Sequence, residues 1–399
     1  MGKPSFRLKN FQTLRDKITS PHPLGLTLAI ITTALLGYMI FALVPFSSGE
    51  HPKAFGSASL SEIKHNVIFA PVKAVQFGIL KYTENDVYIR AASALAALAA
   101  AMLLYLMLRK WYAARVSLLA TLMFISSSWF LHHGRSVNTD VMYLGVLPAL
   151  MLSCMWFLSK RYDTRLPFAA ILVALALYAP GTWLFLLCGL IYFRKYIWRT
   201  SKKISLKIVL LSSFLFLGTL APLFYSFAFR QRQIIEWLGF NSNQDLTLNA
   251  VGSNFLDIPR QLFLSGIDNP LLWLPGTPVF DIFTIAMLIL GFYAFRAGRY
   301  PAREKLVLGA LALSVILIGA GGVATISLLI PLLYIIAANG LAYMLQSWFT
   351  VFPRNPVAKS IGVFLLTVAV GFSCFYQLQS YFVAWPEAGT TEAAIKEDA

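Results

Sequence analysis

The chain has 399 residues, of which 58% are hydrophobic and 13% are charged, and its formal net charge is +16. With a mean hydropathy of +0.68, this composition excludes a soluble globular domain and indicates a polytopic membrane protein. The positive charge would suggest nucleic-acid binding in a soluble protein, but short basic loops on the cytoplasmic side of a membrane explain it better. We therefore expect no nucleic-acid partner.

Apolar blocks long enough to cross a bilayer follow one another along the chain. They predict membrane spans near residues 24–45, 87–108, 116–131, 141–159, 208–229, 279–295, 306–320, 325–346 and 360–382. The first block is too long for the core of a signal peptide, so we expect it to be retained as a helix.

The stretch from Pro167 to Phe193 is long for one helix and short for two. A single span would place the cations between Arg194 and Lys207 outside, against the positive-inside rule. We interpret it as two short helices that meet at Tyr178 to Gly181, where Pro180 breaks the apolar pattern. The sequence thus predicts an all-α fold with about eleven transmembrane helices.

The gaps between the blocks alternate in charge. Basic gaps are Met1 to Pro23, Arg109 to Arg115, Lys160 to Arg165, Arg194 to Lys207, Arg296 to Lys305 and Arg354 to Lys359. The gaps between them hold most of the carboxylates, so we place these on the outer side. The chain is predicted to be a multi-pass protein of the cell membrane with a cytoplasmic N-terminus. One transmembrane domain would cover residues 1–382, with outer loops 45–86, 132–140 and 230–278 and a short outer tail at 383–399.

The second half of the first outer loop alternates apolar and cationic residues. Ile68, Phe69, Val72, Val75 and Leu80 are interrupted by Lys73 and Lys81, a pattern typical of an amphipathic helix lying on the membrane. Cys154, Cys188 and Cys374 lie inside apolar blocks, so we expect no disulfide and no thiol chemistry.

Several weak motifs occur in a defined order. Glu50 follows the first span, and Arg135-Ser-Val-Asn-Thr-Asp140 precedes the span near 141–159. Pro275-Gly-Thr-Pro-Val-Phe-Asp281 leads into a late helix, and Leu329-Ile-Pro331 begins another. In order and spacing the chain resembles the GT-C glycosyltransferases, in particular the family 39 group with the protein O-mannosyltransferases and the lipid A aminoarabinose transferase. The resemblance covers most of the chain.

The resemblance implies transfer of a sugar from a polyprenyl-phosphate carrier to an acceptor on the outer face, with inversion at the anomeric carbon. Glu50 matches the family's general base, and a partly desolvated carboxylate suits that role; the alternative is a solvated loop residue. Asp140 matches the family's second acid and would hold acceptor or sugar hydroxyls. Its alternative role is the N-cap of the following helix, which Thr139 or Asn138 would fill equally well.

Cations on the outer side call for an anionic partner. The planar guanidinium of Arg135 suits a lipid phosphate, and its alternative is an ion pair with Asp140 or Glu50. Lys73 and Arg90 lie where the family's first-loop helices contact the carrier phosphate, although headgroup contact alone would explain such cations, as it does best for Lys81.

The outward-facing imidazoles are His51, His65, His132 and His133. A divalent cation is possible beside so many carboxylates, but no tight ligand spacing supports one, so we predict no metal site and no firm cofactor. We interpret His132 and His133 as hydrogen-bond donors to substrate.

The chain departs from the family in two places. Where members commonly carry Arg or His before the late Leu-x-Pro helix, this chain has Gly322 to Ser327 without a cation. We also expect no folded outer domain of the kind that many relatives carry after the last helix. The predicted partners are therefore a lipid-linked sugar donor, membrane lipids and an unspecified acceptor. The alternatives are a transporter or flippase of a lipid-linked saccharide, or a non-catalytic relative. Ion-driven transport is disfavoured because no charged residue lies near the centre of a confident span.

Overall fold

The structure is a computed structural model that describes residues 66–82, 86–136, 139–157, 162–229, 231–240, 247–270, 273–296, 301–321, 323–391 and 393. Every regular element in these ranges is a helix, which confirms the all-α prediction. The predicted first span at 24–45 and Glu50 lie outside the described residues.

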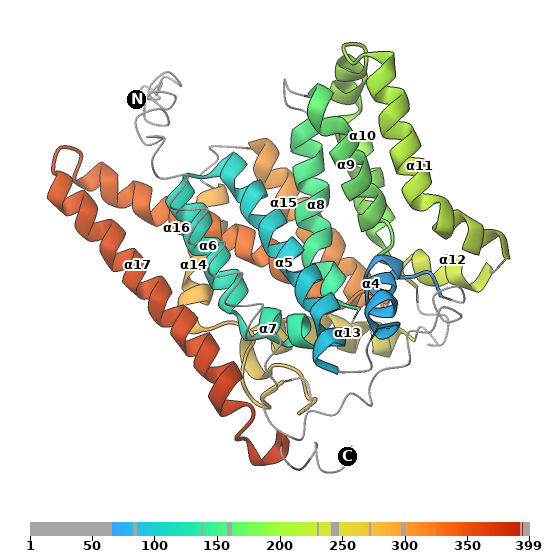
Figure 1. The fold of residues 1–399 in the computed structure, drawn as a ribbon. Coiled ribbons are helices and arrows are strands. Elements are labelled where there is room, and N and C mark those ends of the chain that lie inside the picture. The colour runs from blue at the N-terminus through green and yellow to red at the C-terminus, as the bar shows by residue number, and fades with distance from the viewer. Residues whose placement is uncertain are drawn as a thin grey trace.

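Most of the helices follow one another with short connections (Figure 1), and a longer one joins η2 to α14. In chain order they are α4 (Ala70–Leu80), α5 (Asp86–Trp111), α6 (Ala114–Ser126), α7 (Ser128–Arg135), α8 (Val141–Phe157), α9 (Tyr162–Ala176), α10 (Thr182–Ser201), α11 (Leu206–Phe229), α12 (Gln231–Trp237), α13 (Leu248–Arg260), the π-helix η2 (Gln261–Ser265), α14 (Ile282–Arg296), α15 (Pro301–Gly319), the 3-10 helix η3 (Ile326–Leu328), α16 (Ile330–Val351), α17 (Pro356–Gln379) and the π-helix η4 (Ser380–Ala384).

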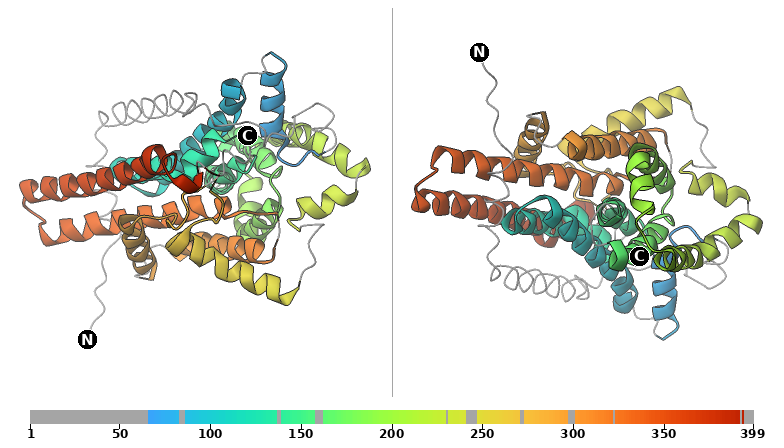
Figure 2. Two further views of the ribbon diagram at one scale, coloured as in Figure 1. Left: turned by 90° about the horizontal axis from the view of Figure 1, so that it is seen from below. Right: turned by 90° about the horizontal axis from the view of Figure 1, so that it is seen from above.

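The long helices form one bundle with α5, α6, α8 and α16 at its centre. The half of α16 from Ile330 to Leu341 is buried throughout. Helix α17 lies against α16 at one edge of the bundle, and α11 lies at the opposite edge (Figures 1 and 2). The short helices α7, α12 and α13 gather at one end of the bundle (Figure 1).

Glycines allow the closest helix pair, α14 and α16, to pack backbone to backbone. A Cβ at Gly291 would lie 2.0 Å from the Ile336 carbonyl oxygen, and one at Gly340 would lie 2.1 Å from the Met287 carbonyl oxygen. Small residues at crossings are a main source of helix association in membranes, where no hydrophobic effect drives helices together. Beside this crossing the Asn339 amide donates to the Gly291 carbonyl (3.0 Å) and accepts from the Tyr112 hydroxyl (3.2 Å).

Within the described residues, four helices are long and apolar enough to cross a membrane: Arg90–Trp111, Leu206–Phe229, Ile326–Val351 and Pro356–Ala384; the bent pair Ala114–Ser126 and Ser128–Arg135 would make a fifth span. The same part of the chain also contains the shorter apolar helices Val141–Phe157, Arg165–Ala176 and Ile282–Arg296. The chain is therefore a multi-pass membrane protein, while the count of about eleven helices stays a prediction.

The predicted break in the stretch from Pro167 to Phe193 is confirmed. Helix α9 ends at Ala176 and α10 begins at Thr182. Between them Gly181 takes a positive φ of 74°, which a glycine adopts without steric cost. The Thr182 hydroxyl donates to the Ala176 and Ala179 carbonyls (2.8 and 2.7 Å), so protein groups satisfy the freed backbone.

The helix in the predicted span at 116–131 is bent. Helix α6 ends at Ser126, and α7 begins at Ser128 with its axis turned by 60°. Ser127 between them is extended, with ψ 136°, and its side chain accepts from the Phe130 amide as the N-cap of α7. A serine at this position favours a new helix start over continuation, because its oxygen satisfies an amide that a continuous helix would bond to a carbonyl.

The start of the predicted tail packs against the bundle. Trp385 is buried, and its indole donates to the Pro270 carbonyl at 3.0 Å. The segment that follows α17 is thus part of the folded molecule at least as far as this tryptophan.

Candidate functional site

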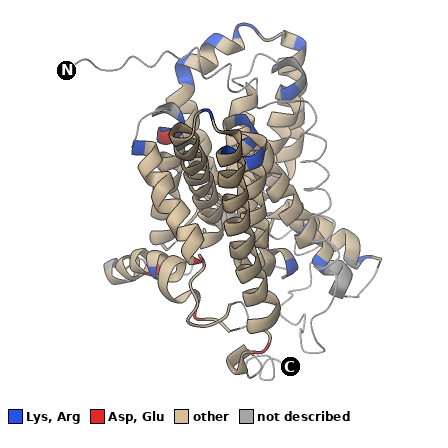
Figure 3. Cartoon of the chain, turned by 90° about the vertical axis from the view of Figure 1, so that its left-hand side faces the viewer, with Lys and Arg blue, Asp and Glu red and all other residues tan. Residues whose placement is uncertain are grey.

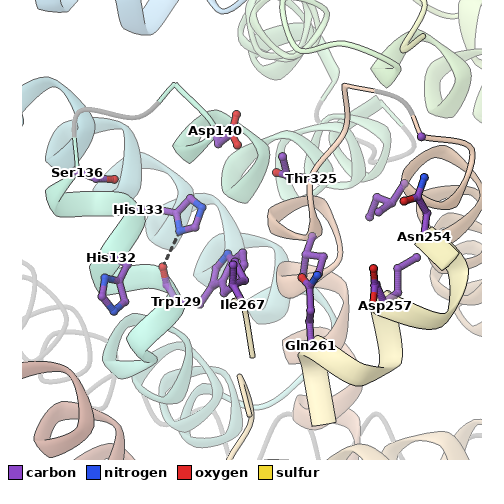
Figure 4. A pocket seen from close by; sticks show the side chains of 14 residues that line it. Trp129, His132, His133, Ser136, Asp140, Asn254, Asp257, Gln261, Ile267 and Thr325 are labelled. Atoms are coloured by element: carbon purple, nitrogen blue, oxygen red, sulfur yellow. Dashed lines mark hydrogen bonds between the residues drawn. The ribbon is translucent and has the colours of Figure 1, made fainter. Parts of the chain in front are cut away.

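A cavity of ≈ 390 Å³ opens at the end of the bundle where α7 and α13 lie (Figure 4). Three segments far apart in the sequence form its walls: α7 with the connection to α8, α13 with η2 and the residues after it, and the connection from α15 to η3. The lining residues are Trp129, His132, His133, Ser136, Asp140, Asn254, Asp257, Ile258, Gln261, Ile267, Ile318, Gly321, Thr325 and Ile326.

The bend at Ser127 places this wall. Because α7 turns away from the α6 span, its histidines reach the cavity. Gln377 of α17 fixes the start of α7: its side-chain oxygen accepts from the Ser128 amide (3.0 Å) and hydroxyl (2.8 Å). Gln377 is itself buried, so its side-chain amide in α17, rather than water, is the partner of the polar groups of Ser128.

Three side chains form a closed set of hydrogen bonds beside the cavity. The Trp129 indole donates to the Ser327 hydroxyl (3.1 Å), and Ser327 Oγ lies 3.0 Å from His133 Nε2. His133 Nδ1 lies 3.0 Å from the Trp129 carbonyl oxygen. A carbonyl only accepts, so Nδ1 carries a proton, and the Ser327 hydroxyl donates to Nε2. This assigns a neutral imidazole that joins α7 to η3.

His133 contacts the segment before the Leu-x-Pro helix, where the sequence departs from the pattern of the family it resembles. The segment before the Leu-x-Pro helix carries no cation of its own, but α7 brings the His133 ring to Ser327 within that segment. An imidazole thus reaches this wall from elsewhere in the chain.

Aromatic rings enclose His132. Its ring meets Tyr381 and Trp385 edge-on, each at 4.5 Å between centroids, and lies 5.4 Å from the Trp273 ring. Tyr381 and Trp385 stack on each other with an interplanar angle of 12°. The segment after α17 therefore covers one side of the cavity wall through aromatic contacts.

Both histidines are neutral near pH 7. Burial lowers the pKa of His133 to about 4, opposed in part by its hydrogen bond to the Trp129 carbonyl. Burial also holds the pKa of His132 well below its usual range, and the nearby His133 and Arg135 lower it further. A buried imidazole loses water around its charged form, which disfavours protonation.

Carboxylates lie on two walls of the cavity. Asp140 precedes the first residue of α8, while Asp257 lies on α13 across the cavity (Figure 4). Asn254, Asp257 and Gln261 are spaced i, i+3 and i+7, so they share one face of α13 and η2. The exposed Arg260 guanidinium pairs with Asp257 at 3.5 Å and also with Asp268. The cavity thus presents hydroxyls, amides and acids, the groups that bind a polyhydroxylated ligand.

The structure brings together three of the predicted site residues: Asp140, His132 and His133 all line the cavity. Asp140 also stands immediately before α8, so its position suits the capping role as well.

The predicted cations lie elsewhere. Arg135 is buried, with its guanidinium 5.9 Å from the centre of the Tyr381 ring. Lys73 Nζ donates to the Asn66 carbonyl (3.3 Å) at α4, and Arg90 is buried in α5. None of the three lines this cavity, and phosphate binding by them stays a prediction.

Sequence reasoning assigned no role to the cavity-lining residues of α13, although the segment Asn254 to Leu264 stood out for its polar side chains. The signal was the polar i, i+3, i+7 row at Asn254, Asp257 and Gln261 in a helix whose other faces carry exposed Leu256 and Phe263. It also missed the Trp129–Ser327 pair, because two residues 198 positions apart carry no joint sequence pattern.

Among the described residues, no group of three or more His, Cys, Asp or Glu side chains is arranged to hold a metal ion. His51 and His65 lie outside these residues, so the expectation of no metal site stays a prediction.

The comparisons with known proteins give a likeness of fold. No protein-family model matches the sequence, and no curated protein matches it. Among solved structures, the chain is similar to ArnT from Cupriavidus metallidurans bound to undecaprenyl phosphate, with a TM-score of 0.53 and 13% sequence identity over 93% of this chain and 77% of that one. The apo form of ArnT gives a TM-score of 0.52 and 12% identity over 93% and 76% of the two chains. At this identity the likeness establishes the fold.

Proposed function

We propose that the chain is an integral-membrane glycosyltransferase that moves a sugar from a polyprenyl-phosphate carrier to an acceptor at the membrane face where the cavity opens. The observation that carries this proposal is the cavity of ≈ 390 Å³ with Asp140 and Asp257 on its walls, set in a fold shared with an undecaprenyl-phosphate-bound structure.

The proposed reaction is a single displacement. Glu50 takes the proton from an acceptor hydroxyl as that oxygen attacks the anomeric carbon, and the lipid phosphate leaves from the opposite face of the sugar. The configuration at the anomeric carbon is thereby inverted. Asp140 orients hydroxyl groups near the reacting carbon, and Asn254 and Gln261 hold others from the far wall.

In this proposal the sugar occupies the cavity, and phosphate recognition falls to Arg135, Lys73 and Arg90 outside its lining. A guanidinium or ammonium stabilises the charge that develops on the leaving phosphate. The neutral His133 does not share that charge; it holds the α7 wall against η3.

Transfer of a radiolabelled sugar from a polyprenyl-phosphate donor, measured in membranes that contain the protein, tests the proposal. We expect Glu50→Gln to lower transfer by roughly 10²–10⁴-fold, the usual contribution of a general base. Asp140→Asn lowers transfer as well, while the control Asp268→Asn, at an exposed ion pair outside the cavity lining, leaves it unchanged.

Undiminished transfer by the Glu50→Gln protein would remove the base assignment. Movement of the intact lipid-linked sugar across proteoliposomes without transfer would instead favour a flippase.

A further inference from the structure

The end of α10 carries a surface that the cavity does not explain. Six cations fall between residues 194 and 207: Arg194, Lys195, Arg199, Lys202, Lys203 and Lys207, and all six are exposed. The sequence holds no carboxylate between Asp163 and Glu236. Among the described residues, no acidic side chain is paired with any of the six. Such a concentration of one charge calls for an anionic partner.

The cations continue a lipid-facing surface along one face of the helix. Leu187 and Ile191 are 44% and 61% exposed, and Arg194, Trp198 and Lys202 follow on the same face at helical spacing. Along this face, apolar side chains give way to a band in which Arg194 and Lys202 flank the ring of Trp198. Apolar side chains followed by a mixed aromatic and cationic band suit the step from acyl chains to the interface and headgroups of a leaflet.

Trp198 lies within the cationic surface and is 67% exposed. The Lys202 ammonium lies 5.1 Å from the centre of its ring. Arg194, Lys195, Trp198 and Arg199 together line a surface depression. The positive-inside rule accounts for the side of the membrane on which the cations lie, but not for an exposed tryptophan among them.

The depression lies at the end of the bundle opposite the cavity. Helix α10 starts just after Gly181, whose amide donates to the Trp237 carbonyl. The residues after Trp237 in turn contact the segment before η3, because the Val323 amide donates to the Gly239 carbonyl. The start of α10 therefore lies at the end of the bundle that holds the cavity. The helix then runs to the other end (Figure 1), where most of the Lys and Arg residues gather (Figure 3).

We propose that this surface, Arg194 to Lys202 of α10, is a binding site for an anionic phospholipid of the leaflet opposite the cavity. The phosphate lies between Arg194 and Arg199, and its acyl chains lie along Leu187, Leu190 and Ile191. Arg guanidinium groups suit phosphate through paired hydrogen bonds, and Trp198 contacts the glycerol region at the interface. The proposal does not depend on the proposed sugar transfer.

Native mass spectrometry of the full chain, released from nanodiscs of mixed phosphatidylglycerol and phosphatidylcholine, tests this site. We expect the wild-type protein to retain phosphatidylglycerol in preference. Combined Arg194→Gln, Lys195→Gln and Arg199→Gln lowers its affinity by roughly a hundredfold, since each cation near anionic headgroups contributes about fivefold.

The matched control removes the same charge elsewhere on the basic surface, with Arg296→Gln, Lys305→Gln and Arg354→Gln. This control retains the lipid. Equal loss in both variants, or retention by the first, overturns the proposal in favour of a diffuse charge effect. Circular dichroism and thermal unfolding of each variant in neutral phosphatidylcholine verify that it is folded; should the triple variant fail to fold, Arg199→Gln alone is compared with Arg354→Gln on the same readout.

Inorganic phosphate added before release separates a lipid from a soluble ligand. Retention of phosphatidylglycerol in its presence supports the proposal. Displacement of the lipid by phosphate at low concentration would contradict it and assign the depression to a soluble phosphorylated ligand.

Discussion

At the residue scale, His133 shows how a polar side chain is accommodated beside an apolar bundle. Both ring nitrogens have partners, Trp129 O and Ser327 Oγ, each at 3.0 Å. Protonation of Nε2 would remove the acceptor of the Ser327 hydroxyl, and a buried hydroxyl without an acceptor costs free energy. The residue is therefore better suited to hold a wall than to carry charge to a phosphate.

This geometry predicts a pH dependence of stability. The pKa of His133 is about 4 in the folded protein, against about 6.5 for an unfolded histidine. The unfolded state thus binds more protons between these values, so stability falls as pH is lowered through this window, by at most about 1.4 kcal/mol per pH unit for one group. We expect His133→Gln to unfold with a flatter dependence on pH between neutral and mildly acidic conditions, measured by denaturant midpoints in detergent. A slope equal to that of the wild type would contradict the assignment.

At the element scale, helix ends place the site. Asp140 stands at the start of α8, the histidines lie in a helix created by the bend at Ser127, and Ser327 lies in the short η3 before α16. The sequence was sufficient to predict the break at Pro180-Gly181, because proline and charge sidedness act locally. It was not sufficient for the bend at Ser127, because Ser126 to Ser128 lie within a run that is apolar on both sides.

Site residues that are close in sequence could be predicted, whereas those brought together by tertiary packing could not. Asp140, His132 and His133 are close in sequence and share a short loop and helix, so one motif indicated them together. Asp257 lies 117 positions after Asp140 on another helix, and its place across the cavity follows from tertiary packing alone.

Close packing of α14 on α16 yields a prediction for this pair. A methyl group at Gly340 would meet the Met287 carbonyl oxygen at 2.1 Å, so Gly340→Ala must separate the helices. We expect a loss of stability of about 1–3 kcal/mol, as for overpacked cores. The control is Gly371→Ala in α17, where a Cβ has no neighbour within 4 Å; it stabilises by up to about 1 kcal/mol through helix propensity. Equal effects of the two changes on thermal unfolding would refute the close-packing argument.

At the scale of the whole molecule, charge separates the two ends. The basic connections gather at one end (Figure 3), and the cavity, whose walls carry Asp140 and Asp257 (Figure 4), lies at the other. The alternation of basic and acidic gaps in the sequence predicted this division, since the positive-inside rule acts on each short loop. Which end faces the cytoplasm stays a prediction, as does the position of Glu50.

The central claim is that a polyprenyl-phosphate sugar donor binds in the cavity between α7 and α13, with the carboxylates of Glu50 and Asp140 beside it. Cryo-electron microscopy of the full chain in nanodiscs that contain undecaprenyl phosphate tests it most directly. We predict density for the lipid phosphate at the mouth of this cavity, with the carboxylates of Glu50 and Asp140 both facing the same space. An empty cavity in the presence of saturating lipid, or Glu50 on a surface remote from Asp140, would contradict the account.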